Sequence, residues 1–300
     1  MPSTPLAPPY RGRFAPSPTG LLHAGSLTTA VGSYLQARSQ GGEWLLRIED
    51  LDPPREMPGA SAAILRTLEA FGFAWDGPVV RQSQRLDAYQ HALDQLIAQQ
   101  RAYPCACTRR EIALAGHPGL DGVVYPGTCR AGLPAGRHGR AWRLRVPAGR
   151  ICFEDGLHGR IEQDVSACVG DYVLKRADGL FAYQLAVVVD DAWQGVNAVV
   201  RGADLLDSTT RQIVLQQALG VPTPSYMHLP VLVNAAGEKL SKQTLAPAIR
   251  PDAAAAELRL ALIRLGHPPP ADCGGLAELW AWALAHWALS RVPAAPVVVG

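Results

Sequence analysis

The sequence lacks several features that define broad classes of protein. Its 300 residues carry 28 Lys and Arg against 26 Asp and Glu, so the formal net charge is only +2 and no overall basic field indicates a nucleic-acid-binding protein. No apolar run approaches the length of a membrane span, and no charged segment followed by an apolar stretch marks a secretory signal. We therefore expect a cytoplasmic protein with no membrane association, in which any RNA contact uses local positive charge.

Three common motifs for phosphate or metal binding are also missing. The chain contains no G-x-x-x-x-G-K-[S/T], no G-x-G-x-x-G and no H-E-x-x-H, which disfavours P-loop enzymes, glycine-rich dinucleotide sites and helical zinc proteases. Six cysteines without a secretory signal favour metal binding over a disulfide framework. With 48% hydrophobic and 18% charged residues, the composition is typical of a globular protein with a sizeable core.

The apolar pattern predicts an α/β fold built on a parallel sheet. Residues 11–15 are predicted as a strand, 24–38 as a helix and 43–48 as a buried strand, which together form a βαβ unit. The apolar run at 180–189 is predicted as a second buried strand. Other predicted elements are helices at 60–70, from Ser83 (as N-cap) to about 97 and at 208–219, strands at 141–146, 150–164 and 229–233, and helices after residue 245.

His23, Gly25 and Ser26 lie where the first predicted strand gives way to a helix. Ligands of parallel α/β sheets bind beyond the carboxyl ends of the strands, and a helix N-terminus there favours phosphate. His23 can donate to a phosphate oxygen, Gly25 allows a flat base to approach the backbone, and Ser26 adds a hydroxyl. The alternative is that His23 only caps the helix.

Lys239 and Lys242 lie on a loop that follows the predicted strand at 229–233. Two cations on a mobile loop can stabilise the charge that develops on a phosphate group under attack. An ordinary solvated loop is the alternative, because short matches of this kind are common. Together with the His23 turn, in the same strand–loop context, the loop favours a phosphate-transfer site.

Three cysteines in the Gly-, Pro- and Arg-rich segment after residue 102 predict a zinc site. Cys105, Cys107 and Cys129 supply three of the four ligands that tetrahedral zinc requires. His117 and Tyr125 are the two candidates for the fourth, and the general preference for imidazole favours His117. Three unligated buried thiols are the alternative.

The same segment carries the strongest local positive charge. No Asp or Glu occurs between Asp121 and Glu154, and we predict that the arginines of this interval form a +6 surface for an RNA backbone. A solvated hairpin face is the alternative for any one of them. These arginines are Arg130, Arg137, Arg140, Arg143, Arg145 and Arg150.

In combination, these segments resemble the class I aminoacyl-tRNA synthetases. Residues 23–26 (HAGS) are similar to the HIGH signature of that family, and residues 239–243 (KLSKQ) are similar to its KMSKS signature. Residues 13–20, 47–50 and 199–204 resemble the glutamyl branch, and the likeness extends from about residue 11 to 244. Ser26 stands where the second His of the signature belongs, so one imidazole donor is replaced by a hydroxyl.

The resemblance implies a ligase that activates L-glutamate with ATP and Mg²⁺ and transfers it from glutamyl-adenylate to RNA. The chain is expected to end before the anticodon-binding domain of a full glutamyl-tRNA synthetase. This implies a branch that modifies queuosine in the anticodon loop of tRNA(Asp), acting as a monomer. Charging of a tRNA 3′ end, a small nucleotidyltransferase and an inactive zinc- and RNA-binding paralogue are the alternatives.

The resemblance also implies roles for individual residues. His23, Lys239 and Lys242 would be catalytic, and His23, Gly25, Ser26 and Lys242 would bind ATP. For the fourth zinc ligand it favours Tyr125, beside Cys105, Cys107 and Cys129, in one structural zinc site per chain. The residues implied for L-glutamate are Arg13, Phe14, Ala15, Pro16, Ser17, Glu49, Tyr183 and Arg201.

The charges of the implied glutamate residues match the ligand. Arg13 and Arg201 can each bind a carboxylate in a fork, and Glu49 can hold the ammonium group. Tyr183 adds a phenolic donor from the strand predicted at 180–189. A purely structural Arg–Glu pair is the alternative, because buried charges need partners.

The implied architecture is a Rossmann-like parallel sheet, the catalytic core of a class I synthetase, in four parts. Residues 1–102 and 171–244 form the two halves of the core, the second with the KMSKS-like loop. Residues 103–170 form an inserted, zinc-containing, acceptor-type subdomain, and 245–300 a short helical C-terminal region.

Overall fold

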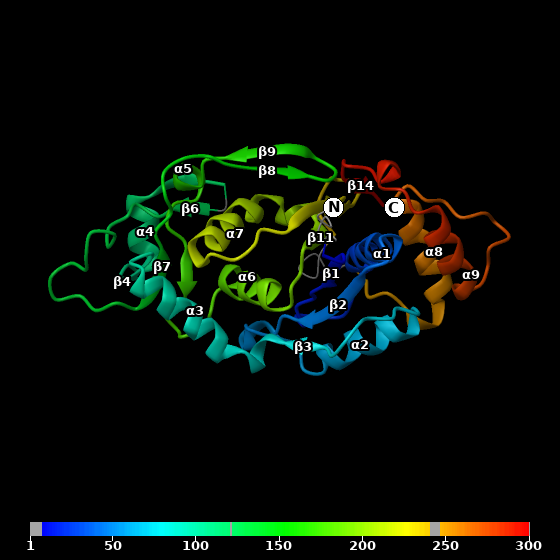
Figure 1. Ribbon diagram of the computed structural model, residues 1–300, viewed down its shortest axis with the longest axis horizontal. Coiled ribbons are helices and arrows are strands. Elements are labelled where there is room, and N and C mark those ends of the chain that lie inside the picture. The colour runs from blue at the N-terminus through cyan, green and yellow to red at the C-terminus, as the bar shows by residue number, and fades with distance from the viewer. Residues whose placement is uncertain (1–7, 121, 241–246, 300) are drawn as a thin grey trace, which may run out of the picture.

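The computed structural model describes residues 8–120, 122–240 and 247–299. The molecule is elongated, with a core around helix α1 (Ala24–Ser39) towards one end and the insertion at the other (Figure 1). Within the described residues, no helix is long and apolar enough to cross a membrane.

The predicted βαβ unit is confirmed. Strand β1 (Arg11–Phe14) pairs in parallel with β2 (Glu43–Ile48), and α1 connects them. Short β3 (Val80–Arg81) extends the sheet on the other side of β2. Helix α2 (Ala60–Ala70) also forms as predicted, whereas α3 (Leu86–Ala98) begins three residues after Ser83. Ser83 does not cap α3, because its N–H and hydroxyl donate to Asp50 at 2.9 and 2.8 Å.

The second half of the core continues the sheet beside β1. Strand β11 (Ala198–Gly202) lies next to β1, where the Asn197 N–H donates to the Arg11 carbonyl at 3.1 Å. Strand β12 (Ser225–Leu229) pairs in parallel with β11, followed by β8 (Ile151–Asp155) and antiparallel β9 (Gly159–Gln163). Helix α7 (Leu206–Leu219) follows β11. The strand predicted at 229–233 is split at Pro230 into the end of β12 and β13 (Leu232–Val233).

The strand predicted at 180–189 is wrong, because this segment forms helix α6 (Tyr183–Trp193). The helix is wedged against α3 and α7, so residues 185–188 are all buried. A helix covered on several sides has a near-continuous apolar sequence and loses the periodicity that distinguishes it from a strand. The strand that neighbours β1 is instead β11.

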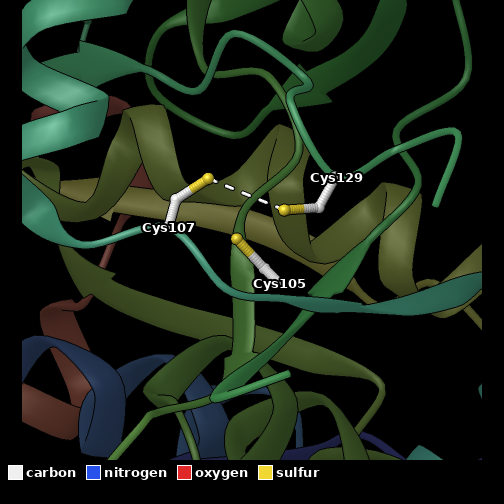
Figure 2. A group of neighbouring side chains, drawn as sticks. All are labelled: Cys105, Cys107 and Cys129. Carbon is white, nitrogen blue, oxygen red and sulfur yellow. Dashed lines mark hydrogen bonds between the residues drawn. The ribbon is translucent and has the colours of Figure 1, made fainter. Parts of the chain in front are cut away.

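The segment predicted as an insertion, 103–170, contributes to a three-stranded antiparallel sheet in the order β10–β7–β4, in which β10 lies just beyond that range. Its strands are β4 (Ala102–Cys105), β7 (Ala141–Leu144) and β10 (Val173–Lys175), so the strand predicted at 141–146 is confirmed. The remaining elements are α4 (Arg109–Ala115), β5 (His117–Gly119), β6 (Gly122–Val124) and α5 (Val165–Cys168). Cys105 ends β4, and Figure 2 shows Cys107 and Cys129 directed towards it.

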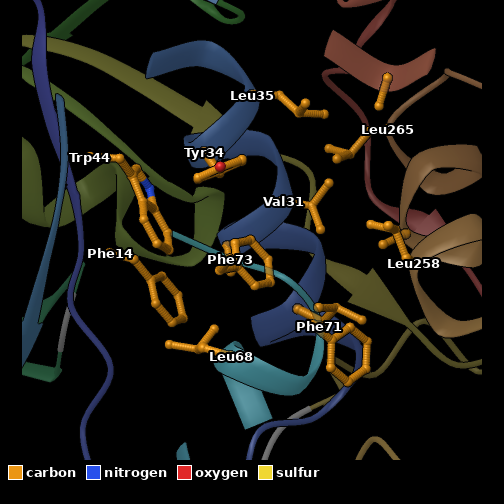
Figure 3. Packing of buried hydrophobic residues seen from close by; sticks show 14 of the residues in the cluster. Phe14, Val31, Tyr34, Leu35, Trp44, Leu68, Phe71, Phe73, Leu258 and Leu265 are labelled. Carbon is orange, nitrogen blue, oxygen red and sulfur yellow. The ribbon is translucent and has the colours of Figure 1, made fainter. Parts of the chain in front are cut away.

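The C-terminal region is helical as predicted and completes the main core. Helices α8 (Ala254–Arg264) and α9 (Leu276–His286) cover α1, and Leu258 and Leu265 face Val31 and Leu35 across this interface (Figure 3). The chain then pairs as β14 (Val297–Val298) with β13. Short 3₁₀ turns occur at Pro53–Arg55, Gln82–Gln84, Ala203–Leu205, Pro251–Ala253 and Leu289–Arg291.

Candidate active site

His23 is the N-cap of α1 and also lines a cavity. Its Nδ1 accepts the backbone N–H groups of Gly25 and Ser26, at 3.2 and 3.4 Å. With the Nδ1 lone pair used in this way, the proton of a neutral imidazole is on Nε2. The capping role and the donor role predicted for His23 are therefore compatible, because they use different ring nitrogens.

Ser26 completes the capping box of α1. Its hydroxyl accepts the His23 N–H at 2.7 Å and donates to the His23 carbonyl at 2.8 Å. The hydroxyl predicted to reach phosphate is thus engaged in the turn itself.

The two remote signatures meet at one cavity of about 320 Å³. His23, Gly25 and Ser26 line it together with Lys239 and Leu240 from the loop after β13. The Lys239 ammonium forms an ion pair with Asp204 at 2.5 Å, so the loop is tied to the end of β11. Lys242, predicted on the same loop, lies outside the described residues.

A second cavity of about 350 Å³ adjoins the first and shares Phe14, Ser17, Thr29 and Gly202 with it. All the residues implied for glutamate come together here, except that Pro16 lines the first cavity instead. Those lining the second are Arg13, Phe14, Ala15, Ser17, Glu49, Tyr183 and Arg201. Tyr183 reaches the cavity from the first residue of α6, not from a strand.

Arg13 is held by Asp191, a residue that the sequence reasoning did not assign. The carboxylate binds Arg13 at 3.1 and 3.3 Å and also binds Arg47 at 2.8 Å, and all three side chains are buried. Burial raises the pKa of Asp191, but the charges of Arg13 and Arg47 outweigh this and hold it below its usual value. The signal available in the sequence was an acidic pair, Asp190–Asp191, inside an apolar run.

Glu49 is the anionic group of the second cavity. Arg47 lies 3.4 Å from its carboxylate, and the side chain is almost fully buried. Burial raises the pKa of Glu49 even though Arg47 and Arg13 oppose the shift. A cationic ligand group beside Glu49 would therefore stabilise its ionised form.

Arg201 is a buried cation that forms no ion pair within the described part of the chain. Its Nε donates to Nε2 of His228 at 3.1 Å, and one terminal nitrogen donates to the Thr209 hydroxyl at 2.8 Å. The other terminal nitrogen lies 3.5 Å from the Tyr183 phenol. A buried guanidinium with only neutral partners beside a cavity suits an anionic ligand.

The three cysteines predicted as zinc ligands form a compact cluster (Figure 2). Their sulfurs lie within 4.8 Å of one another, with Cys107 and Cys129 3.6 Å apart. The Tyr125 hydroxyl lies 3.4 Å from the Cys105 sulfur and 3.6 Å from the Cys107 sulfur. Three sulfurs and one phenol oxygen this close together supply the four ligand atoms that tetrahedral zinc requires.

His117, the other candidate for the fourth ligand, lies outside this cluster. Its side chain is exposed, and Nε2 lies 3.4 Å from the Ala167 carbonyl. The geometry therefore favours Tyr125 in the proposed ligand set.

The predicted charge of +6 is not reached on this surface, because carboxylates from other parts of the chain pair with three of the six arginines. Arg130 pairs with Asp171, Arg137 with Glu111 and Arg150 with Glu162. Arg143 is buried, with its guanidinium over the Tyr125 ring. The gap between acidic residues along the sequence therefore does not produce a surface free of acids.

The chain belongs to the class I tRNA synthetases (E and Q), whose catalytic-domain model matches residues 10–265. This confirms the resemblance seen in the sequence. The chain is 68% identical over 288 residues to the glutamyl-Q tRNA(Asp) synthetase of Chromobacterium violaceum, covering 96% of this chain and 97% of that protein. It is 64% identical to the glutamyl-Q tRNA(Asp) synthetase of Dechloromonas aromatica, covering 95% and 96%.

The fold is similar to solved glutamate-tRNA ligases. The crystal structure of a glutamate tRNA ligase from Elizabethkingia meningosepticum, in complex with its amino acid, matches with a TM-score of 0.80 and 26% identity. The match covers 98% of this chain and 67% of that chain. The predicted α/β core of a class I synthetase is thereby confirmed.

Proposed function

We propose that this protein is an ATP-dependent ligase that activates L-glutamate and transfers it to queuosine in the anticodon loop of tRNA(Asp). The observation that carries the proposal is the pair of adjoining cavities, one lined by both synthetase signatures and the other by Arg13, Glu49 and Arg201. Relatives with the corresponding name match nearly end to end.

The second cavity supplies the charges that glutamate requires. Arg201 has no carboxylate partner among the described residues, so it can bind a substrate carboxylate without first breaking an ion pair. Glu49 can hold the ammonium group, and Arg13, oriented by Asp191, provides the second cation. The pocket thus matches one ammonium and two carboxylates.

In the first step, the α-carboxylate of glutamate attacks the α-phosphorus of ATP. A carboxyl–phosphate bond forms, the bond to pyrophosphate breaks, and glutamyl-adenylate remains. His23, through Nε2–H, and the lysines of the 239–242 loop stabilise the charge on the phosphates. ATP enters as its Mg²⁺ complex, and no protein nucleophile takes part.

In the second step, a hydroxyl of queuosine attacks the activated carbonyl. An ester bond forms and AMP leaves with the bonding electrons, while the hydroxyl proton passes to solvent. A third cavity of about 340 Å³ shares Ser17, Glu49, Arg55 and Tyr183 with the glutamate cavity, so an acceptor that enters there would lie beside the bound glutamate.

We assign one structural zinc ion to Cys105, Cys107, Tyr125 and Cys129. Only five residues form the buried cluster of this part of the insertion, and three of them are ligands in this set: Cys105, Tyr125 and Cys129. Bound zinc would supply folding free energy that so small an apolar cluster does not.

Two measurements test the proposal. Glutamate-dependent ATP–pyrophosphate exchange is expected from the purified protein, and its absence would favour an inactive paralogue. Glutamylation is then compared on tRNA(Asp) with queuosine, tRNA(Asp) without it, and tRNA(Glu). Only the first is expected to be charged, and charging of tRNA(Glu) at its 3′ end would support the alternative acceptor.

A further inference from the structure

Three buried polar residues lie side by side on adjacent strands, and one of them, Arg201, lines the glutamate cavity. Arg201 on β11 is the direct register partner of His228 on β12, and Asp155 lies at the end of the neighbouring strand β8. His228 is fully buried, and Asp155 and Arg201 are each 4% exposed. The sheet order β11–β12–β8 therefore places acid, imidazole and guanidinium in one line.

The directions of the hydrogen bonds in this line follow from its two ends. Asp155 Oδ2 lies 2.6 Å from His228 Nδ1, so an ionised carboxylate accepts the Nδ1 proton. Arg201 has only donors, so its Nε–H at 3.1 Å requires a lone pair on Nε2. Both partners select the same neutral tautomer of His228. Burial lowers the pKa of His228, with Arg201 acting in the same direction and Asp155 against it.

Asp155 is itself fixed. Its other oxygen accepts the backbone N–H groups of Leu157 and His158, each at 3.0 Å, in the turn between β8 and β9. The His158 ring lies 3.0 Å from the His228 carbonyl and packs the same turn against β12. The line therefore begins at a hydrogen-bonded turn and ends at Arg201 in the cavity wall.

A neutral acceptor has a specific advantage at this position. A carboxylate in place of His228 would hold Arg201 but would also neutralise it, and a substrate carboxylate would then compete for the guanidinium. Imidazole holds Nε–H and leaves the positive charge for the ligand. The Asp155 carboxylate lies beyond the ring and sets its tautomer.

We propose that His228 and Asp155 are positioning residues that orient Arg201 to bind a carboxylate of glutamate. This inference rests on the proposed function, because it assumes that glutamate occupies the second cavity. Neither residue lines that cavity, so both act through Arg201.

The test compares His228→Gln with His228→Leu. The Gln side chain places an amide oxygen near the position of Nε2 and can still accept from Arg201, whereas Leu is of similar size and cannot. In the exchange assay, we expect His228→Leu to raise the KM for glutamate about tenfold or more, as for loss of a hydrogen bond to a charged group. Its kcat should stay within about threefold, and His228→Gln should keep KM within about threefold of wild type.

Asp155→Asn provides a second test. When the Asn side-chain oxygen accepts the backbone N–H groups of Leu157 and His158, its NH₂ group donates to Nδ1 of His228. The imidazole proton then lies on Nε2, facing the Arg201 donor. We expect the KM for glutamate to rise about tenfold in this variant, in which the size of the side chain is unchanged.

His267→Gln is the matched control. His267 is also fully buried but belongs to the C-terminal region, where its ring contacts the Leu265 carbonyl and the Ala288 N–H. This substitution should lower the melting temperature and leave the KM unchanged. An equal rise in KM in this control, or equal KM values for His228→Leu and His228→Gln, would overturn the proposal.

The outcome separates this proposal from the proposed function. If wild-type protein shows no glutamate-dependent exchange, the proposed function fails whatever the variants do. If wild type is active and His228→Leu and Asp155→Asn keep its KM, only the positioning role fails. If His228→Leu does not fold, the comparison of Asp155→Asn with wild type still decides.

Discussion

The carboxylate of Asp191 accepts two hydrogen bonds from the guanidinium of Arg13, at 3.1 and 3.3 Å, beside the glutamate cavity, and both side chains are buried. Arg47 binds the same carboxylate from the other side at 2.8 Å. One carboxylate therefore binds two buried cations, and its loss would leave both without this partner.

Asp191→Ala is expected to lower the free energy of unfolding by about 3–5 kcal/mol, the usual cost of removing one member of a buried ion pair. Urea denaturation followed by tryptophan fluorescence measures this. Asp94→Ala, at an exposed position on α3, is the control and should change stability by no more than about 0.5 kcal/mol. A similar effect in both variants would contradict the role of Asp191.

Acid should destabilise the protein partly through Asp191. Burial raises the pKa of this group, but Arg13 and Arg47 lower it further, so the folded-state pKa lies below the unfolded value of about 3.9. The stabilisation is therefore complete above that value and is lost as pH falls through the folded pKa. Unfolding free energies measured from pH 6 to 3 should fall less steeply below about pH 4 in Asp191→Asn than in wild type.

Two substitutions of His23 should separate capping from catalysis. Asn is a good N-cap residue but has no donor at the position of Nε2, whereas Ala lacks both functions. We expect His23→Ala to destabilise the protein by about 1 kcal/mol and His23→Asn by much less. Both should lower the rate of pyrophosphate exchange by about 10²–10³. An active His23→Asn variant would show that the imidazole only caps the helix.

Lys242→Ala should lower the kcat of adenylate formation by about 10²–10³, because a cation acting on the phosphates matters most when charge develops there. The KM for glutamate should stay within about threefold, since Lys239 and Leu240, the described residues of this loop, line the first cavity and not the one with Arg13. Lys175→Ala is a control, because the Lys175 ammonium donates to Gln90 and lines neither cavity. Unchanged kcat in Lys242→Ala would remove this lysine from the mechanism.

Metal analysis should find one zinc ion per chain, and Cys129→Ala should lose it. Tyr125→Phe keeps the aromatic ring but removes the oxygen beside the sulfurs, and we expect weaker zinc retention against a chelator. His117→Ala and Cys152→Ser are matched controls, because both residues are exposed and neither belongs to the cluster. Loss of zinc in His117→Ala with retention in Tyr125→Phe would reverse the ligand assignment.

Local patterns in the sequence predicted the parts of the fold that depend on neighbours in the chain. The βαβ unit has clear periodicity, and the turn after its first strand carries His23 at a helix N-terminus. Helix α6 was not predicted because α3, α7 and β10 pack against it, so few of its side chains face solvent and need to be polar. Apolar burial on several sides erases the difference between a helix and a buried strand.

The electrostatic partners could not be read from the sequence. Asp191 meets Arg13, and Asp155 meets His228, only after the two halves of the sheet come together. Similarly, Arg130 pairs with Asp171, which lies 41 residues further along the chain. Residue types indicated what charges the pocket would hold, but pairing across distant segments depends on tertiary structure.

Strand β14, close to the last described residue, pairs with β13 and so supports the strand before the active-site loop. Val297 donates to the Val231 carbonyl at 2.9 Å, immediately before the strand that leads into the Lys239 loop. Removing residues 294–299 would take away the hydrogen-bonded neighbour of β13, so a truncation at this end is expected to weaken the support of the Lys239 loop although none of these residues lines the cavity.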